Sequence, residues 1–417
     1  MKNNQTIEYR PEIDGLRALA VIPVMLFHSG LNTFAGGYVG VDIFFVISGY
    51  LITSIILSQM NNENFSLLKF YERRARRILP ALIFVCLTTI PLAYLLMTPD
   101  MYKEFGKQLI AVQIFLSNFY FWNEINYFSP SVDLNPLIHS WSLAVEEQFY
   151  LFFPIFLLFF YRFGTKITII LISLIIIVSL LFAQFSGNLK LEYPFIQSNF
   201  SWYSPSSLSS FYLPFARAWE LLIGSLIAFF LLKNNTKTSN FVNDVLCILG
   251  LIFILISIFF FSPNTPFPSI FTTLPVIGTG MIIIFSSNSD LSKKIFSNSF
   301  LVKIGLISFS AYLWHQPIFA FLRLKDSSEL NFTYIIISFI ISFGLAFLTW
   351  KFLEQPFRNA KIISSKALIL ILSTSSIIVI VAGINIYLNN GYIDRYTDTE
   401  KILLNPPKNT EVCKINR

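Results

Sequence analysis

Two ionisable side chains stand in an otherwise apolar run near the amino terminus. In I-D-G-L-R-A-L-A-V-I-P-V-M-L-F-H, Arg17 is followed by His28 eleven residues later. On an α-helix these residues lie roughly 16 Å apart along the axis, at about 1.5 Å per residue. An ionisable group inside a membrane segment costs about a few kcal/mol or more, so it indicates a functional site. His28 taken alone would equally fit a histidine that hydrogen-bonds a neighbouring helix.

Carboxylates enter apolar runs at two further places. Asp42 lies in G-G-Y-V-G-V-D-I-F-F-V-I-S-G-Y-L-I-T, together with Ser48, and we expect it to orient the His28 imidazole. Glu146 and Glu147 lie in H-S-W-S-L-A-V-E-E-Q-F-Y. Adjacent residues point about 100° apart on a helix, so at most one of the two glutamates faces a given site. Glu147 follows His139 by roughly two turns and shares nearly the same face.

A cluster of arginines precedes the third apolar segment, in Y-E-R-R-A-R-R-I-L-P. The pairs Arg73/Arg76 and Arg74/Arg77 are each spaced i, i+3, which places both members of a pair on one helical face. Two guanidinium groups on one face can bind phosphate oxygens in a bidentate manner. The alternative is that these residues only anchor the helix at the membrane surface.

The remaining polar residues in apolar segments suggest no metal chemistry. His315, in S-A-Y-L-W-H-Q-P, is the third and last histidine. We expect the three histidines to lie at different depths, and they lack the spacing of metal ligands, so no metal site is predicted. Arg217 and Glu220 are spaced i, i+3 and are expected to pair with each other. The sequence contains no G-x-S-x-G motif, phosphate-binding loop or dinucleotide fingerprint.

The composition is that of a polytopic membrane protein. Hydrophobic residues make up 54% and charged residues 13% of the chain, whereas soluble domains carry about 25% charged residues. The net charge of +7 is assigned to loops that face the cytoplasm and anionic lipid, and no nucleic-acid partner is expected. Segments of roughly 20 apolar residues are predicted at 13–31, 38–58, 78–97, 105–122, 141–161, 167–185, 211–232, 244–262, 270–287, 300–322, 332–353 and 367–388.

The lysines and arginines gather on one side of the membrane only if the segment 105–122 does not cross it. We therefore predict an all-α protein with about eleven spans and one re-entrant or interfacial helix. Its amino terminus faces the cytoplasm and its carboxyl tail lies outside. The aromatic stretch before His139 could cover a site. The longest outer loop, at 186–210, could meet a sugar, although its aromatic residues also suit interfacial anchoring.

The cysteines differ in their surroundings. Cys86 and Cys247 lie in apolar segments and are read as small buried hydrophobes. Cys413 stands alone in a polar tail, which suggests a missing partner.

The ordered set of motifs resembles the acyltransferase-3 family of bacterial integral-membrane O-acyltransferases. The resemblance rests on Y-R-P-E-I-D-G-L-R-A-L-A-V, the Arg17-x10-His28 pair, the run from 36 to 53, F-Y-E-R-R-A-R-R-I-L-P-A, H-S-W-S-L-A-V-E-E-Q-F-Y, S-A-Y-L-W-H-Q-P and E-Q-P-F-R. These runs span residues 9 to 358.

The resemblance implies transfer of an acyl group, usually acetyl from cytoplasmic acetyl-CoA, to a hydroxyl of a cell-surface glycan such as O-antigen, exopolysaccharide or peptidoglycan. Arg17 and His28 match the essential pair of the family, and Glu147 matches an acidic residue of a later motif. The arginines at 73 to 77 match a motif taken to hold the CoA phosphates or pantetheine.

The expected site follows from these assignments. We expect catalysis by His28, Asp42, Glu147 and Arg17, and donor binding by Arg73, Arg74, Arg76 and Arg77. We expect substrate contacts from Ser48, His139, Trp141, Tyr150 and His315. We expect Asp42 or Glu147 to orient the His28 imidazole. Two routes stay open: His28 acts as general base towards the sugar hydroxyl, or it accepts the acyl group and passes it on.

Three domains are expected: the acyltransferase-3 membrane domain at 1–360, an additional span at 361–390, and an outer tail at 391–417. Many relatives continue into an exported hydrolase-like domain, so the tail looks like the start of such a domain, removed here or never present. Two other functions fit the sequence: a transporter or flippase that uses the buried ionisable residues as a relay, and a scaffold that recruits a separate acetylase.

Overall fold

A computed structural model of the protein describes residues 9–124, 132–188, 211–233, 238–262, 265–326, 330–397 and 399–401. Throughout these residues the regular structure is helical, without a strand, which confirms the all-α class. The predicted outer loop at 186–210 lies almost entirely outside the described residues, and Cys413 lies outside them as well.

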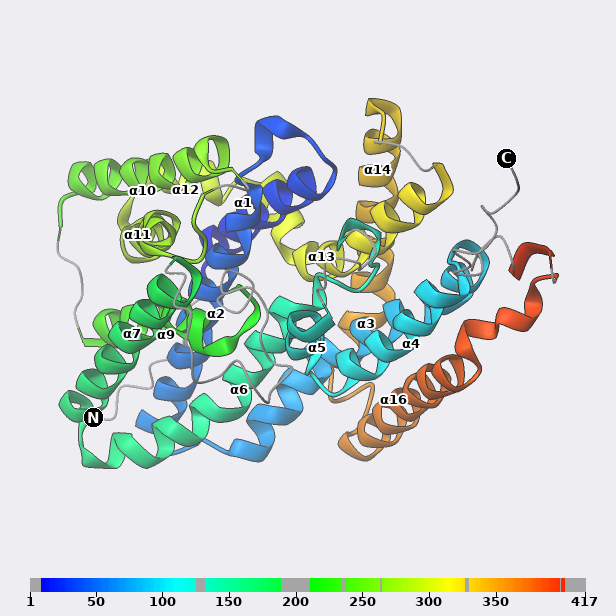
Figure 1. Ribbon diagram of the computed structural model, residues 1–417. Helices are drawn as coiled ribbons and strands as arrows, with labels where there is room; N and C mark the ends of the chain where they lie inside the picture. Colours follow the sequence, from blue (N-terminus) through cyan, green and yellow to red (C-terminus); the bar gives the residue numbers. More distant parts are fainter. Residues whose placement is uncertain are drawn as a thin grey trace, which may run out of the picture.

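The long helices follow the predicted apolar segments, and Figure 1 shows their arrangement. They are α1 (Pro11–His28), α2 (Gly40–Asn61), α3 (Leu67–Leu96), α4 (Pro99–Gln113), α5 (Ser117–Glu124), α6 (Ser140–Phe160), α7 (Thr165–Asn188), α9 (Pro214–Lys233), α10 (Asn240–Phe260), α11 (Thr273–Phe285), α12 (Asp290–Phe296), α13 (Ser299–Asp326), α14 (Phe332–Thr349) and α16 (Ser365–Leu388). A π-helical turn (Trp350–Glu354) joins α14 to the short α15 (Gln355–Arg358).

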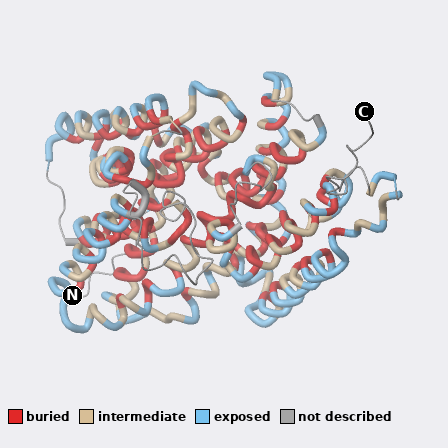
Figure 2. The backbone as a smooth tube through the Cα atoms, viewed as in Figure 1, coloured by how far each residue is buried: buried red, intermediate tan, exposed pale blue. Residues whose placement is uncertain are grey.

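The helix that carries Arg17 and His28 lies inside the bundle. α1 packs against α13 on one side and α2 on another, and eleven of its eighteen residues are buried. A side chain at Gly305 of α13 would meet the backbone oxygen of Asp14 at 1.8 Å, so only glycine permits this approach. Figure 2 shows the buried residues concentrated in the middle of the molecule.

Nine helices in the described part of the chain are long and apolar enough to cross a membrane. A tenth candidate combines α12 with α13, which meet at a 59° bend. α1 is not among them, because Glu12, Asp14 and Arg17 all lie in its first two turns. With α1 counted, the number of spans would reach the predicted eleven. The protein is a polytopic helical membrane protein, as the sequence indicates.

The segment predicted not to cross is broken in the structure. α4 ends at Gln113 and α5 begins at Ser117, and between them Phe115 takes a positive φ of 54°. At about 1.5 Å per residue, the fifteen residues of α4 are too short for the roughly 30 Å hydrocarbon core. The break therefore agrees with a re-entrant or interfacial path. α4 packs along α16 (Figure 1), the helix at the position of the predicted additional span.

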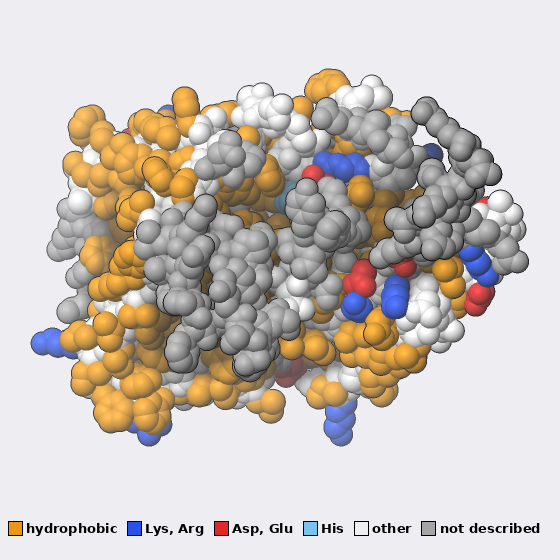
Figure 3. Space-filling model, in the orientation of Figure 1, with side chains coloured by type: hydrophobic (Ala, Val, Ile, Leu, Met, Phe, Trp, Pro, Cys, Tyr) orange, Lys and Arg blue, Asp and Glu red, His pale blue; other side chains and the backbone are white. Residues whose placement is uncertain are grey.

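Large apolar side chains cover the outer surfaces of the peripheral helices. Ile170, Phe260, Ile340 and Ile369 are each more than 60% exposed, and Figure 3 shows hydrophobic side chains over much of one face. A soluble protein rarely exposes such patches, whereas lipid chains would bury them. Ionisable side chains inside such a bundle are costly and therefore indicate a functional site.

Candidate active site

A pocket with a cationic lining lies between the inner helices. α1, α2, α3, α6 and α13 all contribute to its wall. Its polar lining consists of Arg17, Ser48, Arg74, Arg77, Ser142, Glu146, Tyr150 and Tyr312. The cavity volume of about 70 Å³ holds a few water molecules or a narrow chain, since one water needs about 10–15 Å³ on this scale.

Three arginines in this pocket face one lining carboxylate. Arg17 forms an ion pair with Asp14 at 3.2 Å, whereas Arg74 leaves its buried Nε without a hydrogen-bond partner. Arg17 and Arg77 are close enough to repel each other electrostatically, as are Arg74 and Arg77. Buried polar atoms are rarely left unpaired. Three guanidinium groups on one pocket wall, one of them with an unpaired buried Nε, indicate a site for an anion.

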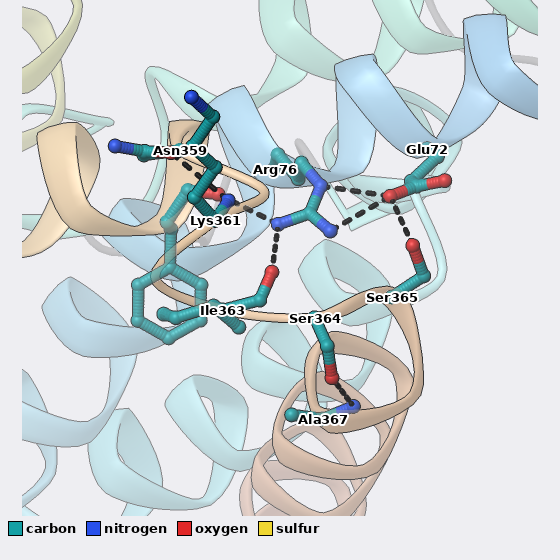
Figure 4. A network of polar contacts seen from close by, with 9 residues as sticks. Glu72, Arg76, Asn359, Lys361, Ile363, Ser364, Ser365 and Ala367 are labelled. Atoms are coloured by element: carbon teal, nitrogen blue, oxygen red, sulfur yellow. Dashed lines mark hydrogen bonds and ion pairs between the residues drawn. The ribbon is translucent and has the colours of Figure 1, made fainter.

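The other two arginines of the predicted cluster do not line the pocket. Arg73 donates to the Gln59 side chain at 3.0 Å on the exposed side of α3. Arg76 is buried and donates to Glu72 and to the backbone oxygens of Phe357 and Ile363 (Figure 4). The donor-binding role of all four arginines stays a prediction. Arg74 and Arg77 face the pocket, whereas Arg76 hydrogen-bonds α3 to the segment that follows α15.

Of the two adjacent glutamates, Glu146 faces the pocket. The Ser48 hydroxyl donates a hydrogen bond to Glu146 Oε1 at 2.7 Å, which joins α2 to α6. Glu147 does not line the pocket, and its Oε1 is buried without a hydrogen-bond partner. Its charged neighbours are Glu146, Arg74 and Arg77. The predicted role of Glu147 in orienting His28 therefore has no contact in the structure to support it.

The three histidines meet, contrary to the prediction that they lie at different depths. The ring centroids of His28 and His315 are 5.1 Å apart, and those of His139 and His315 are 5.5 Å apart. α1 and α13 pack together and bring their histidines into contact, and His139 lies directly before α6. Loop counting could not reveal this, because it assigns a side of the membrane and not a depth.

Backbone contacts indicate the tautomers of two of these rings. Nδ1 of His28 lies 3.0 Å from the backbone oxygen of Val24, and Nδ1 of His315 lies 2.5 Å from that of Tyr312. A carbonyl oxygen only accepts, so in each neutral ring we infer that Nδ1 carries the proton. Nε2 of His315 faces Nδ1 of His28 at 3.4 Å. Nε2 of His28 is then an unprotonated base, and His28 is the only half-buried ring of the three.

Tyr312 separates the pocket from the histidines. Its ring lines the pocket and also lies 5.2 Å from the His315 ring and 5.4 Å from the His139 ring. Its hydroxyl donates to the backbone oxygen of His139 at 2.9 Å and lies 2.7 Å from the Ser142 hydroxyl. The motifs of the sequence do not indicate a role for Tyr312. Its place three residues before His315 on one helix was the available signal.

Asp42 does not contact His28, so that predicted pairing is wrong. Asp42 Oδ1 lies 3.2 Å from Arg217 Nη2, and Arg217 Nη1 lies 3.0 Å from Glu220 Oε1. All three side chains are fully buried. The predicted pair of Arg217 and Glu220 is therefore present, with Asp42 as a third member. Trp141, expected to contact substrate, instead packs its ring 5.6 Å from the Arg217 guanidinium.

Within the described residues, no group of three or more His, Cys, Asp or Glu side chains has the arrangement of a metal site. In the histidine cluster, two Nδ1 atoms already bond to carbonyl oxygens. The arrangement suits proton transfer or nucleophilic attack by His28 beside an anion pocket.

Comparisons with known proteins agree with this chemistry. A family model described as an acyltransferase domain matches residues 10–351. The chain is 33% identical to the peptidoglycan O-acetyltransferase OatA of Listeria monocytogenes over 84% of its own length and 56% of that protein. It is 32% identical to the O-acetyltransferase OatA of Staphylococcus aureus, over 84% of its own length and 57% of that protein. The chain thus spans a little over half the length of these curated relatives.

No solved structure matches the chain. The family model covers both the arginine pocket and the histidine cluster, from Arg17 to His315. The chain belongs to the acyltransferase-3 family.

Proposed function

We propose that this chain transfers an acetyl group from cytoplasmic acetyl-CoA to a hydroxyl of a cell-surface glycan at the bacterial inner membrane. One observation carries the proposal. The arginine pocket adjoins the histidine cluster, because Tyr312 and Ser142 line the pocket and also contact His139. A phosphate-bearing donor and a base that activates a hydroxyl are the two requirements of such a transfer. Family membership supports the acyl chemistry.

The donor enters from the side of Arg17, Arg74 and Arg77. These three side chains attract the negative charge of CoA, and the unpaired Nε of Arg74 offers a donor for a phosphate oxygen. Because the pocket is narrow, only the thin pantetheine arm and its thioester fit inside it. The thioester then reaches the vicinity of Tyr312, next to the histidines.

The acceptor reaches His28 from the outer side. As general base, Nε2 of His28 removes the proton of the sugar hydroxyl, whose oxygen attacks the thioester carbonyl and releases CoA thiolate, which is then protonated. In the alternative route, Nε2 itself takes the acetyl group before the sugar does. Peptidoglycan is the first acceptor to test, because it is named for the Listeria relative. O-antigen and exopolysaccharide remain further candidates.

The transporter hypothesis has less support. The family model and the named relatives are acyltransferases and O-acetyltransferases, and neither supports transport.

The test measures CoA thiol release by the purified chain in detergent, with acetyl-CoA and soluble peptidoglycan fragments as substrates. Wild type should release thiol in an acceptor-dependent manner. His28→Ala should lower the rate by about 10²-fold or more, because it removes the base or nucleophile. CoA binding by the same variant, measured by calorimetry, controls for folding. Full transfer by His28→Ala would show that the central assignment is wrong.

The two routes are separated by rapid quench with labelled acetyl-CoA and no acceptor. A histidine-bound acetyl group is expected only for the relay, and its absence favours the general base. A scaffold that recruits another enzyme would show no turnover with the isolated chain.

A further inference from the structure

A second, wider hollow opens where the chain leaves α14. It has a cavity volume of about 460 Å³ and is lined by Lys351, Gln355, Pro356, Arg358, Asn359 and Ile362. The polar lining thus comprises two cations and two carboxamides, and no carboxylate is among the lining residues. A surface of hydrogen-bond donors without acidic groups is suited to phosphate oxygens.

The cations of this hollow are only partly neutralised. In the described part of the chain, no carboxylate forms an ion pair with Lys351, whose Nζ lies 5.3 Å from the Phe352 ring centre. Arg358 uses Nη2 to contact Glu354 at 2.5 Å, but its Nε is buried without a hydrogen-bond partner. The Asn359 side-chain oxygen accepts from the Lys361 backbone, which leaves the amide NH₂ to donate elsewhere.

The arginine cluster of α3 holds this hollow in place. Arg76 donates to the backbone oxygens of Phe357 at 3.0 Å and Ile363 at 2.8 Å, on either side of Arg358, Asn359 and Ile362 (Figure 4). Glu72 binds Arg76 and also accepts from the Ser365 hydroxyl at 2.7 Å. Arg77, the next residue along α3, lines the narrow pocket. One helix therefore supports both sites.

Charged residues of the hollow interact electrostatically with those of the narrow pocket. Arg358 of the hollow lies close enough to Arg17 and Arg77 of the pocket for mutual repulsion. The pocket is the more enclosed of the two spaces, and the hollow is the more open. A donor with a narrow arm and a broad nucleotide end matches this pair, because an open space accepts a base, a ribose and their phosphates.

We propose that Lys351, Arg358 and Asn359 form a phosphate-binding subsite for the nucleotide end of the acyl donor. This inference rests on the proposed function, which puts the acetyl end of the same donor in the arginine pocket. The nearest competing source of the same chemistry is the phosphate of an anionic lipid headgroup. Exposed lysines near a membrane surface attract such lipids.

The experiment compares acetyl-CoA with S-acetylpantetheine, which lacks the nucleotide and its phosphates. The purified chain is placed in nanodiscs of neutral phosphatidylcholine, and kcat/KM is measured for both donors. Lys351→Ala should lower the ratio of the acetyl-CoA value to the S-acetylpantetheine value about tenfold, which corresponds to about 1.4 kcal/mol. Lys366→Ala removes an exposed lysine of α16 that does not line the hollow, and should preserve the wild-type ratio.

A second measurement does not need turnover. Adenosine 3′,5′-bisphosphate should bind wild type in calorimetry and bind Lys351→Ala about tenfold more weakly. If wild type binds this nucleotide but transfers no acetyl group, the proposed function fails and the subsite stands. An unchanged donor ratio in a protein that does transfer acetyl overturns the subsite alone. An effect of Lys351→Ala that appears only in nanodiscs with anionic lipid also overturns it, in favour of a lipid contact.

Discussion

The four arginines between residues 73 and 77 of α3 make different contacts. Arg74 and Arg77 face the cationic pocket, Arg73 bonds to Gln59 on the exposed side, and Arg76 holds backbone carbonyls. The i, i+3 spacing correctly pairs Arg74 with Arg77 on one face. The face that meets the pocket is decided by how α3 rotates against α13 and the segment after α15, with which it packs.

This division predicts unequal effects within the cluster. Arg77→Ala should raise the KM for acetyl-CoA about tenfold or more, because a charge-assisted hydrogen bond contributes about 1.5–3 kcal/mol. Arg73→Ala is the matched control and should leave KM close to the wild-type value, since Arg73 points away from the pocket. Steady-state kinetics of thiol release measure both. Equal increases for the two variants would contradict the assignment.

At the level of elements, α2 and α9 pack in close contact. Gly49 of α2 lies where a side chain would meet the backbone oxygen of Leu221 at 1.8 Å, and Gly224 of α9 lies in similar contact with Val46. Small residues allow membrane helices to approach closely. The same helix pair carries the buried ion triad of Asp42, Arg217 and Glu220.

Gly49→Ala should force α2 and α9 apart. The added methyl group meets backbone, which cannot move aside as a side chain can, and overpacking of this kind typically costs about 1–3 kcal/mol. We expect a lower midpoint of thermal unfolding in detergent, measured by tryptophan fluorescence. Gly344→Ala is the control, because no atom lies within 4 Å of the new methyl group. An unchanged midpoint for Gly49→Ala would argue against the close helix contact.

The triad predicts a strong effect at Arg217. Arg217→Ala leaves two fully buried carboxylates without their cation, and breaking a buried ion pair costs about 3–5 kcal/mol. We expect aggregation or a markedly lower thermal midpoint. The triple variant Arg217→Met, Asp42→Asn, Glu220→Gln should recover much of the stability, because it removes the charges together. If Arg217→Ala were as stable as wild type, the triad would not be structural.

At the scale of the whole molecule, lipid-facing apolar helices surround a polar interior. The exposed surfaces of α7, α10, α14 and α16 carry large aliphatic and aromatic side chains. The buried arginines and histidines instead come from α1, α3, α9, α13 and the turn before α6. This distribution fits a membrane enzyme whose chemistry is kept away from lipid.

The proposed orientation can be tested by labelling single cysteines in intact cells. In a chain with Cys413→Ser, the remaining Cys86 and Cys247 are buried. A membrane-impermeant maleimide should label Asp394→Cys from outside, but Lys361→Cys only after permeabilisation, because basic loops stay in the cytoplasm. Both positions are exposed in the structure. The reverse pattern would invert the topology and place the donor pocket on the wrong side.

The helical membrane fold, the limits of most helices and the ionisable residues of the interior could all be predicted from the amino-acid sequence. These properties are local. A run of about 20 apolar residues indicates a membrane helix, and a charge within it indicates a polar interior, whichever other helices lie next to it. The distribution of lysine and arginine also indicated that the segment 105–122 does not cross the membrane.

Only the tertiary structure decided which interior residues meet. The three histidines lie together, and Asp42 pairs with Arg217 and not with His28. Glu146, and not Glu147, faces the pocket, and Tyr312 lies between the pocket and the histidine cluster. The reason is physical. Spacing along one helix determines which residues share a face, whereas contact between helices depends on their rotation, depth and crossing, which are set by packing across the whole bundle.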